Sequence, residues 1–242
     1  MRYVQFCISW LVQCVSRVPE KIFAGGYLHR KFFGQEHLRE AERIKRKNGT
    51  GVIFAINHVS HFDPIIFLAG ISPFSSLAPM FWLSFTGKQY KTDEKFKLLS
   101  LIYGDLFFYM YGCIPPQSGF KDYAVALSKH SKLVAAGGSL AVFPEGKILL
   151  DTQREKPRGG IAYLAEKTGA PIVPVYIGGL KRLTVREFWA GTRHATVTYG
   201  KPFFLSDLGT FSKEDPERYH HIAEKILDRV YALSDMMNVN TA

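Results

Sequence analysis

The sequence predicts an α/β fold in which a mostly parallel central sheet is flanked by helices. Short apolar runs alternate with amphipathic stretches along the chain, and the first run, residues 51–56, is apolar throughout. Continuous apolar runs are typical of strands that are buried on both faces. Strands that alternate with helices favour parallel pairing. The expected strands are residues 51–56, 139–143, 171–177 and 195–199.

Helical periodicity and glycine stops predict the helices between these strands. Residues 35–48 carry apolar side chains on one helical face, and Gly49 behind them suits a C-terminal cap. The other expected helices are residues 120–136, ended by Gly137 and Gly138, residues 159–168, ended by Gly169, and residues 217–233.

Residues 1–33 are expected to form an N-terminal segment, and residues 34–242 to form the domain itself. Residues 3–16 are uncharged, but a helix needs about 20 apolar residues to span a bilayer. Apolar side chains recur there at helical spacing and cations bracket them, so we expect an amphipathic helix that lies in the membrane interface. The alternative is an amphipathic helix packed on its own domain.

The net charge of the chain favours an anionic partner. The chain has 31 Lys and Arg against 21 Asp and Glu, a formal charge of +10, which suits nucleic acid, an anionic membrane or a phosphorylated ligand. The sequence shows no pattern of a known nucleic-acid-binding module, so we expect no nucleic-acid partner. The three cysteines have neither zinc-binding nor disulfide spacing.

Two further stretches, residues 64–87 and 98–114, are strongly apolar. Prolines interrupt the first, which predicts two short apolar elements instead of a membrane span. The side chains of both stretches are candidates for an acyl-chain groove, a lipid contact or ordinary core.

The densest group of titratable side chains directly follows the first expected strand, where residues 57–64 read NHVSHFDP. A histidine accepts a proton near neutral pH, and a carboxylate on its far nitrogen fixes its tautomer. His58 and Asp63 therefore predict a general base and the acid that orients it, if a turn brings them together.

Two other interpretations of this group remain open. Ser60 and Asp63 have the spacing of a helix capping box, and that cap can itself form the required turn. His58, His61 and Asp63 are potential metal ligands, although known metal motifs use other spacings and further ligands.

The second expected strand runs into Phe143, Pro144, Glu145 and Gly146. Proline fixes a turn and glycine lets a ligand approach the backbone. Because ligands of parallel sheets sit beyond the carboxyl ends of the strands, we expect Glu145 at the same sheet edge as His58.

These two blocks together resemble the glycerolipid acyltransferase family of phospholipid synthesis, which includes lysophosphatidic acid acyltransferase. Three later blocks are similar to that family as well: residues 170–175 (APIVPV), Arg158-Gly159 before a helix, and residues 197–202 (VTYGKP). The resemblance covers about residues 50–205 in order and spacing.

The resemblance implies transfer of a fatty acyl group from acyl-CoA or acyl carrier protein, used as co-substrate without a further cofactor, to a hydroxyl of a lyso-glycerolipid. His58 would be the general base, oriented by Asp63, and no covalent acyl-enzyme is required. His61 occupies a variable position of the motif. The resemblance also implies a peripheral or monotopic enzyme on the cytoplasmic face of a membrane. The implied substrate-binding residues are Asn57, Ser60, Lys121, Pro144, Glu145, Gly146, Lys147 and Arg158.

The sequence departs from the family at two arginine positions. The block that normally ends in an arginine for the acceptor's phosphate has Gln117 or Ser118 there, and Lys147 and Ile148 follow Gly146 where the family has Thr-Arg. Arginine is the usual bidentate phosphate ligand. We therefore expect either 1-acylglycerol-3-phosphate, with Lys121, Lys147 or Arg158 in place of the arginines, or a different acceptor, which would be another lyso-lipid or a polar-lipid hydroxyl without phosphate. A metal-dependent hydrolase and a basic binding module are the alternatives outside acyl transfer.

Overall fold

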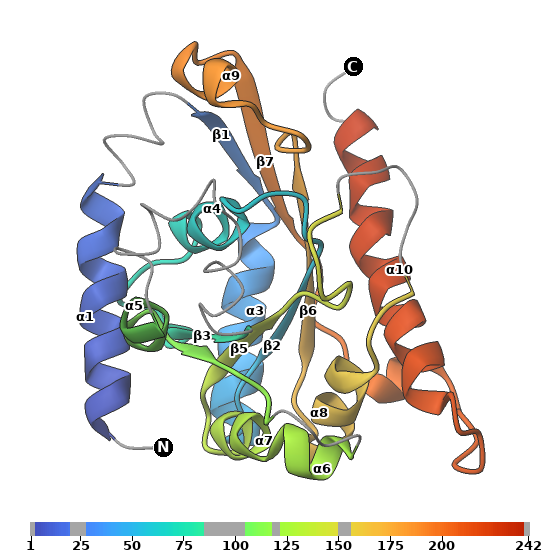
Figure 1. Ribbon diagram of the computed structural model, residues 1–242. Coiled ribbons are helices and arrows are strands. Elements are labelled where there is room, and N and C mark those ends of the chain that lie inside the picture. The colour runs from blue at the N-terminus through green and yellow to red at the C-terminus, as the bar shows by residue number, and fades with distance from the viewer. Residues whose placement is uncertain (1–2, 20–27, 85–104, 118–121, 150–155, 240–242) are drawn as a thin grey trace.

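The computed structural model describes residues 3–19, 28–84, 105–117, 122–149 and 156–239, and these residues build a seven-stranded sheet with helices on both faces (Figure 1). The strand order is β1-β7-β6-β2-β5-β3-β4, and only the β6–β7 pair is antiparallel. The predicted mostly parallel α/β fold is confirmed. The strands are β1 (Leu28–Phe33), β2 (Ile53–Ile56), β3 (Met80–Leu83), β4 (Cys113–Ile114), β5 (Ser139–Val142), β6 (Ile172–Gly178) and β7 (Arg193–Tyr199).

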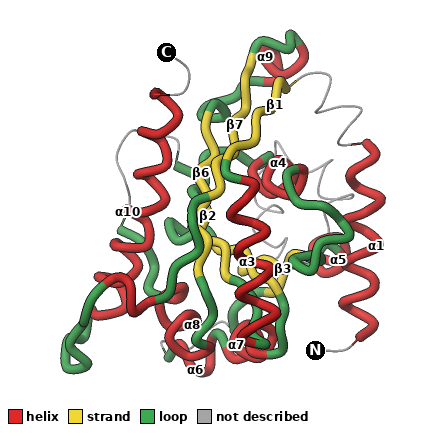
Figure 2. Tube along the Cα trace, turned by 180° about the vertical axis from the view of Figure 1, so that it is seen from behind, coloured by secondary structure: helices red, strands yellow, loops and turns green. Residues whose placement is uncertain are grey.

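Strand β2 lies at the centre of the sheet and separates two hydrophobic cores. Phe54 and Ile56 pack into the core beneath α3 (Gln35–Asn48) and α4 (Asp63–Ala69), whereas Ile53 and Ala55 pack into the core beneath α7 (Ser128–Ala135), α8 (Gly160–Thr168) and α10 (Arg218–Val239). Figure 2 shows α3 and α4 on one side of the central strands and α10 on the other. All four side chains are fully buried, which explains why the strand is apolar at every position. The helices are α1 (Tyr3–Pro19), α3 (Gln35–Asn48), α4 (Asp63–Ala69), α5 (Asp105–Met110), α6 (Tyr123–Ala126), α7 (Ser128–Ala135), α8 (Gly160–Thr168), α9 (Val185–Trp189), α10 (Arg218–Val239) and the 3-10 helix η5 (Leu205–Leu208).

The helices follow the predicted periodicity closely. Gly49 ends α3 with a φ of 69°, and its N–H donates to the carbonyl of Lys45, as a glycine cap does. Gly169 caps α8 in the same left-handed conformation. The helix expected over residues 120–136 is divided into α6 and α7, with Leu127 between them.

The N-terminal segment expected over residues 1–33 has two parts in the structure. Helix α1 lies beside α5 at one side of the molecule, whereas β1 pairs in parallel with β7 and is an edge strand of the main sheet. The last residues of this segment therefore belong to the domain and are not separate from it. The sequence pattern missed β1 and β4. The two short apolar elements expected over residues 64–87 are α4 and β3.

Helix α1 is packed with its polar side toward the protein. Ser9 and Gln13 are buried, and the Gln13 side chain donates to the carbonyls of Met80 and Tyr111 and accepts from the N–H of Met80. Trp10 donates its indole N–H to the carbonyl of Pro73 at 2.8 Å. No described helix is long and apolar enough to cross a membrane.

Candidate active site

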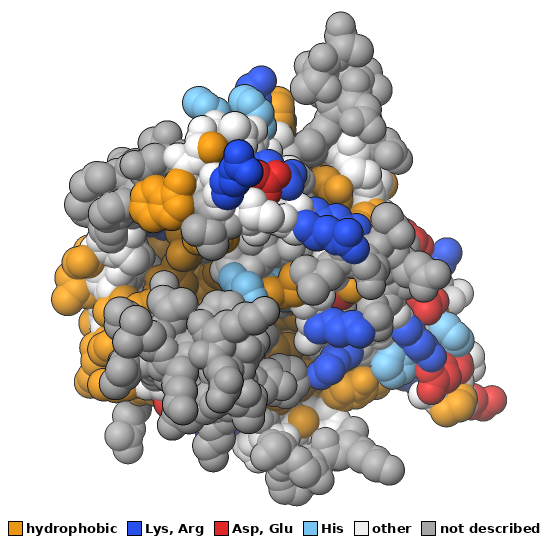
Figure 3. Space-filling view, turned by 45° about the horizontal axis from the view of Figure 1, so that its top comes forward, with side chains coloured by type: hydrophobic (Ala, Val, Ile, Leu, Met, Phe, Trp, Pro, Cys, Tyr) orange, Lys and Arg blue, Asp and Glu red, His pale blue; other side chains and the backbone are white. Residues whose placement is uncertain are grey.

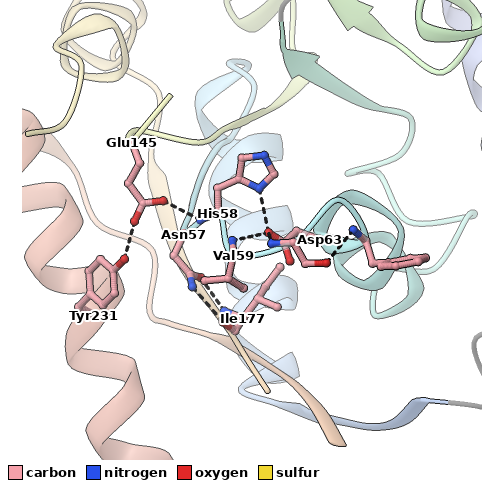
Figure 4. Close-up of polar contacts among 9 residues, drawn as sticks. Asn57, His58, Val59, Asp63, Glu145, Ile177 and Tyr231 are labelled. Carbon is pink, nitrogen blue, oxygen red and sulfur yellow. Dashed lines mark hydrogen bonds and ion pairs between the residues drawn. The ribbon is translucent and has the colours of Figure 1, made fainter. Parts of the chain in front are cut away.

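His58 and Asp63 meet at the carboxyl end of β2 (Figure 4). His58 Nδ1 lies 2.8 Å from Asp63 Oδ2, and the Asp63 side chain is fully buried while that of His58 is 18% exposed. The same oxygen accepts the main-chain N–H groups of Val59 and Ser60 at 2.7 and 2.9 Å. Because this oxygen acts as an acceptor, Nδ1 must carry the proton, and Nε2 of the neutral ring is left as the basic nitrogen.

The turn that brings the pair together is one half of the expected capping box. Asp63 reaches back to the N–H of Ser60, and the N–H of Asp63 donates to the Ser60 carbonyl at 3.2 Å. The Ser60 hydroxyl accepts instead from the N–H of Phe62. Ser60 does not cap the helix as expected, because the N-cap of α4 is Phe62 and no side chain of the described residues caps it. The other half of the interpretation holds, since the side chain that contacts His58 also forms the turn before α4.

The main chain of His58 is held by the loop after β5. Its N–H donates to Glu145 Oε2 at 2.6 Å, and its carbonyl accepts from the N–H of Leu149 at 2.8 Å. Gly146 completes the bend with a φ of 70°, a conformation that favours glycine. The expected placement of Glu145 at the same sheet edge as His58 is thus what the structure shows.

The carboxylate of Glu145 is turned inward. It is 3% exposed, and its second oxygen accepts from the hydroxyl of Tyr231 on α10. Burial raises the pKa of this carboxyl, whereas the hydrogen bonds from Tyr231 and from the His58 N–H act to lower the pKa. Both oxygens therefore bind protein donors.

An aromatic stack that the sequence reasoning missed supports the imidazole. The ring of Phe143 lies parallel to that of His58 with centroids 4.1 Å apart, and Trp82 stacks on Phe143 from β3 at 6.0 Å. The only sequence signal was the aromatic residue directly before Pro144. The stack restrains the plane of the imidazole ring. Because Nδ1 faces Asp63, Nε2 points away from it (Figure 4).

Asn57 belongs to the framework of the site. Its side chain is fully buried, donates to the carbonyl of Ile177 at 2.9 Å and accepts from the N–H of Ile177 at 2.7 Å. This amide joins the end of β2 to the end of β6, which positions the residue that follows it, His58.

Two of the three expected cations, Lys147 and Arg158, lie at the Gly146 bend. The Arg158 side chain lies against Gly146, since a Cβ placed on that glycine would be 2.5 Å from Arg158 Nε. The N–H of Arg158 donates to the carbonyl of the buried Pro144 at 2.8 Å, and Lys147 is exposed. Lys121 lies outside the described residues.

Gln117 and His61 are the other positions named from the sequence. Gln117, at the place of the family's arginine, donates its side-chain amide to Ser128 Oγ at 3.2 Å. His61 is exposed. Over the described ranges, no three His, Cys, Asp or Glu side chains are grouped so as to hold a metal ion.

Comparison with known proteins agrees with this geometry. The model of the acyltransferase family matches residues 29–178. Two proteins named probable 1-acyl-sn-glycerol-3-phosphate acyltransferase are similar: that of Mycoplasma pneumoniae is 29% identical over 139 residues, 57% of this chain and 47% of that protein. That of Mycoplasma genitalium is 29% identical over 129 residues, 53% and 44% of the two chains. The chain thus spans about half the length of these relatives.

The crystal structure of the 1-acyl-sn-glycerophosphate (LPA) acyltransferase PlsC from Thermotoga maritima has a similar fold. The TM-score is 0.57 at 17% identity, and the match covers 95% of this chain and 82% of that one. The fold is therefore shared, and the family model covers more than half of the chain, including both blocks that meet at His58. The chain belongs to the acyltransferase family.

Proposed function

We propose that the protein transfers a fatty acyl group from a thioester, acyl-CoA or acyl carrier protein, to a hydroxyl of a lyso-glycerolipid. The observation that carries the proposal is the His58–Asp63 pair, with Nδ1 engaged by a buried carboxylate and Nε2 left as the basic nitrogen. The names of the relatives point to 1-acyl-sn-glycerol 3-phosphate as the first acceptor to test.

In the proposed reaction, His58 Nε2 accepts the proton of the acceptor hydroxyl. The oxygen attacks the thioester carbonyl, a C–O bond forms, the C–S bond breaks, and the proton returns to the departing thiolate. Asp63 stabilises the imidazolium that forms between these steps. General base catalysis of this kind contributes about 10²–10⁴-fold, so positioning of the two substrates must supply the rest.

The test is an acyl-transfer assay on the purified protein with acyl-CoA, acyl carrier protein and a panel of lyso-lipids, with lipid products identified by mass spectrometry. We expect the wild type to form a diacyl product and His58→Ala to lose about 10²–10⁴-fold in rate. His61→Ala, three residues away, is the matched control and should retain activity. Equal rates for His58→Ala and the wild type would remove His58 from the mechanism.

We infer that Arg158 takes the part of the missing arginines toward an acceptor phosphate. Its guanidinium lies at the Gly146 bend, beside the loop that holds His58, and a guanidinium matches phosphate geometry better than an ammonium. Arg158→Ala should raise KM for 1-acyl-sn-glycerol 3-phosphate about tenfold and leave KM for a monoacylglycerol, which has no phosphate, unchanged. Arg158→Lys should lie between Arg158→Ala and the wild type. Equal effects on both acceptors would favour an acceptor recognised without its terminal phosphate.

We also propose that α1 contacts the membrane, because several of its apolar side chains face outward while the polar Ser9 and Gln13 are buried. Leu11 and Val15 are 58% and 59% exposed on α1, and Leu106 is 69% exposed on neighbouring α5. Hydrophobic side chains gather at this side of the molecule (Figure 3). Exposed apolar surface of this extent suits lipid.

Vesicle flotation tests this contact. The double variant Leu11→Gln/Val15→Gln should bind anionic vesicles markedly less than the wild type while it keeps the same melting temperature. Val125→Gln on α6, which is also exposed, is the control and should float like the wild type. Undiminished flotation of the double variant would refute the contact.

A further inference from the structure

The carboxylate of Glu145 is closed in by donors from two distant parts of the chain. Oε2 accepts the main-chain N–H of His58 at 2.6 Å, and Oε1 accepts the hydroxyl of Tyr231 (Figure 4). With 3% of the residue exposed, both oxygens are used inside the protein. The Glu145 side chain therefore links Tyr231 of α10 to the main chain of His58, and these two hydrogen bonds are called the bracket below.

Tyr231 comes from a part of the chain that the family model does not cover. It lies on α10, beyond residue 178 where the match ends, and 86 residues from Glu145. Its ring packs edge-on against Tyr176 of β6 with centroids 5.9 Å apart. The hydroxyl is thereby fixed at the sheet edge where β5 and β2 end.

We propose that Tyr231 is a positioning residue, whose hydroxyl holds the Glu145 carboxylate in the orientation that receives the His58 N–H. Helix α10 thus helps to set the place of the proposed base through Glu145. This inference rests on the proposed function of His58.

Removal of the hydroxyl has a consequence that depends on pH. Burial and the nearby charge of Asp63 raise the pKa of Glu145, whereas the hydrogen bond from Tyr231 and the contacts with His58 lower it. A further charged group, the Arg158 side chain, lies against the adjacent Gly146. Without the hydroxyl the pKa rises, so more of the carboxyl is protonated at a given pH. A protonated carboxyl is a poorer acceptor for the His58 N–H, and activity is lost first on the acidic side.

The experiment compares Tyr231→Phe with Tyr219→Phe. Both tyrosines lie on α10 and both donate to a carboxylate, because the Tyr219 hydroxyl binds Glu166 at 2.7 Å, away from the site. We expect Tyr231→Phe to lower kcat/KM about tenfold at neutral pH and to move the acidic limb of the kcat/KM profile up by about one pH unit. Tyr219→Phe should leave both unchanged.

A double-mutant cycle with Glu145→Gln tests whether Tyr231 acts on His58 through the Glu145 carboxylate. The amide does not titrate, so Tyr231→Phe added to Glu145→Gln should cause no further shift of the profile, and the two losses should be far from additive. An unshifted profile in Tyr231→Phe alone, or fully additive losses, would overturn the proposal.

Amide hydrogen exchange of the peptide that contains His58 provides a measurement independent of activity. If the bracket holds the His58 N–H, this amide exchanges severalfold faster in Tyr231→Phe than in the wild type or in Tyr219→Phe. Unchanged exchange would refute the bracket even in an active enzyme. A wild type without acyl transfer but with faster exchange in Tyr231→Phe would refute the proposed function and leave the bracket in place.

Discussion

Asp63→Asn removes the negative charge of the carboxylate that contacts His58 but can keep the hydrogen bonds that this side chain accepts. A single oxygen, Oδ2, accepts from His58, Val59 and Ser60, whereas Oδ1 is buried and has no hydrogen-bond partner among the described residues. An asparagine can therefore place its oxygen where Oδ2 lies and its NH₂ where Oδ1 lies. The turn and the imidazole tautomer are kept while the negative charge is lost, although the NH₂ group is then a buried donor without an acceptor among the described residues.

The magnitude follows from the distance between the two charges. Two unit charges about 4 Å apart interact by about 4 kcal/mol at an effective dielectric constant of about 20. Loss of this stabilisation for the imidazolium in the transition state corresponds to about 10³-fold in kcat. Asp63→Ala, which removes all three hydrogen bonds, should in addition lower the melting temperature, because two main-chain N–H groups lose their acceptor.

The assay measures kcat and KM with saturating thioester, together with thermal unfolding. Asp122→Asn is the matched control, since Asp122 caps α6 through the N–H of Ala124, away from the site. We expect Asp63→Asn to lose about 10³-fold in kcat with KM close to wild type, and to lower the melting temperature less than Asp63→Ala does. A kcat within threefold of the wild type would show that the charge does not assist the reaction.

Three further outcomes follow from the contacts around the site. Phe143→Ala removes the ring stacked on His58 and should lower kcat about tenfold with little change in KM, as steady-state kinetics would show. Asn57→Ala leaves the N–H and carbonyl of Ile177 without their buried partner, so chemical denaturation should reveal a loss of about 2–4 kcal/mol in unfolding free energy. Glu145 has a raised pKa in the folded protein, so its folded state binds more protons than the unfolded chain just above the ordinary pKa of glutamate. The melting temperature of the wild type should therefore fall relative to Glu145→Gln as pH rises through that range, and a constant difference would contradict this assignment.

Strands β2 and β5, which are buried at every position, could be predicted from their apolar runs. Central β2 is apolar at every position because both faces are covered, and this pattern can be read directly. Edge strand β1 reads LHRKFF and β4 has only two residues, so neither has a pattern that distinguishes it from a loop. Their places depend on pairing with β7 and β3, which are distant in the chain.

The candidate site was predictable where local chemistry determines it. His58 and Asp63 are five residues apart, and the Asp63 side chain also forms the turn between them. The arrangement of the pair therefore depends only on residues within the motif. The partner of Glu145 could not be found in this way. Tyr231 lies on an amphipathic helix whose pattern indicates only that one face is buried, and the hydrogen bond depends on how α10 crosses the sheet.

The main chain of His58 is secured on both sides by one short loop, through Glu145 at its N–H and Leu149 at its carbonyl. The main chain of His58 therefore cannot shift without breaking two buried contacts at once. Under the proposed function, changes in lipid preference should then arise from side chains around the site and leave His58 where it is. An engineer who wants a new acceptor should vary exposed positions such as Lys147 and keep Phe143, Glu145 and Leu149 unchanged.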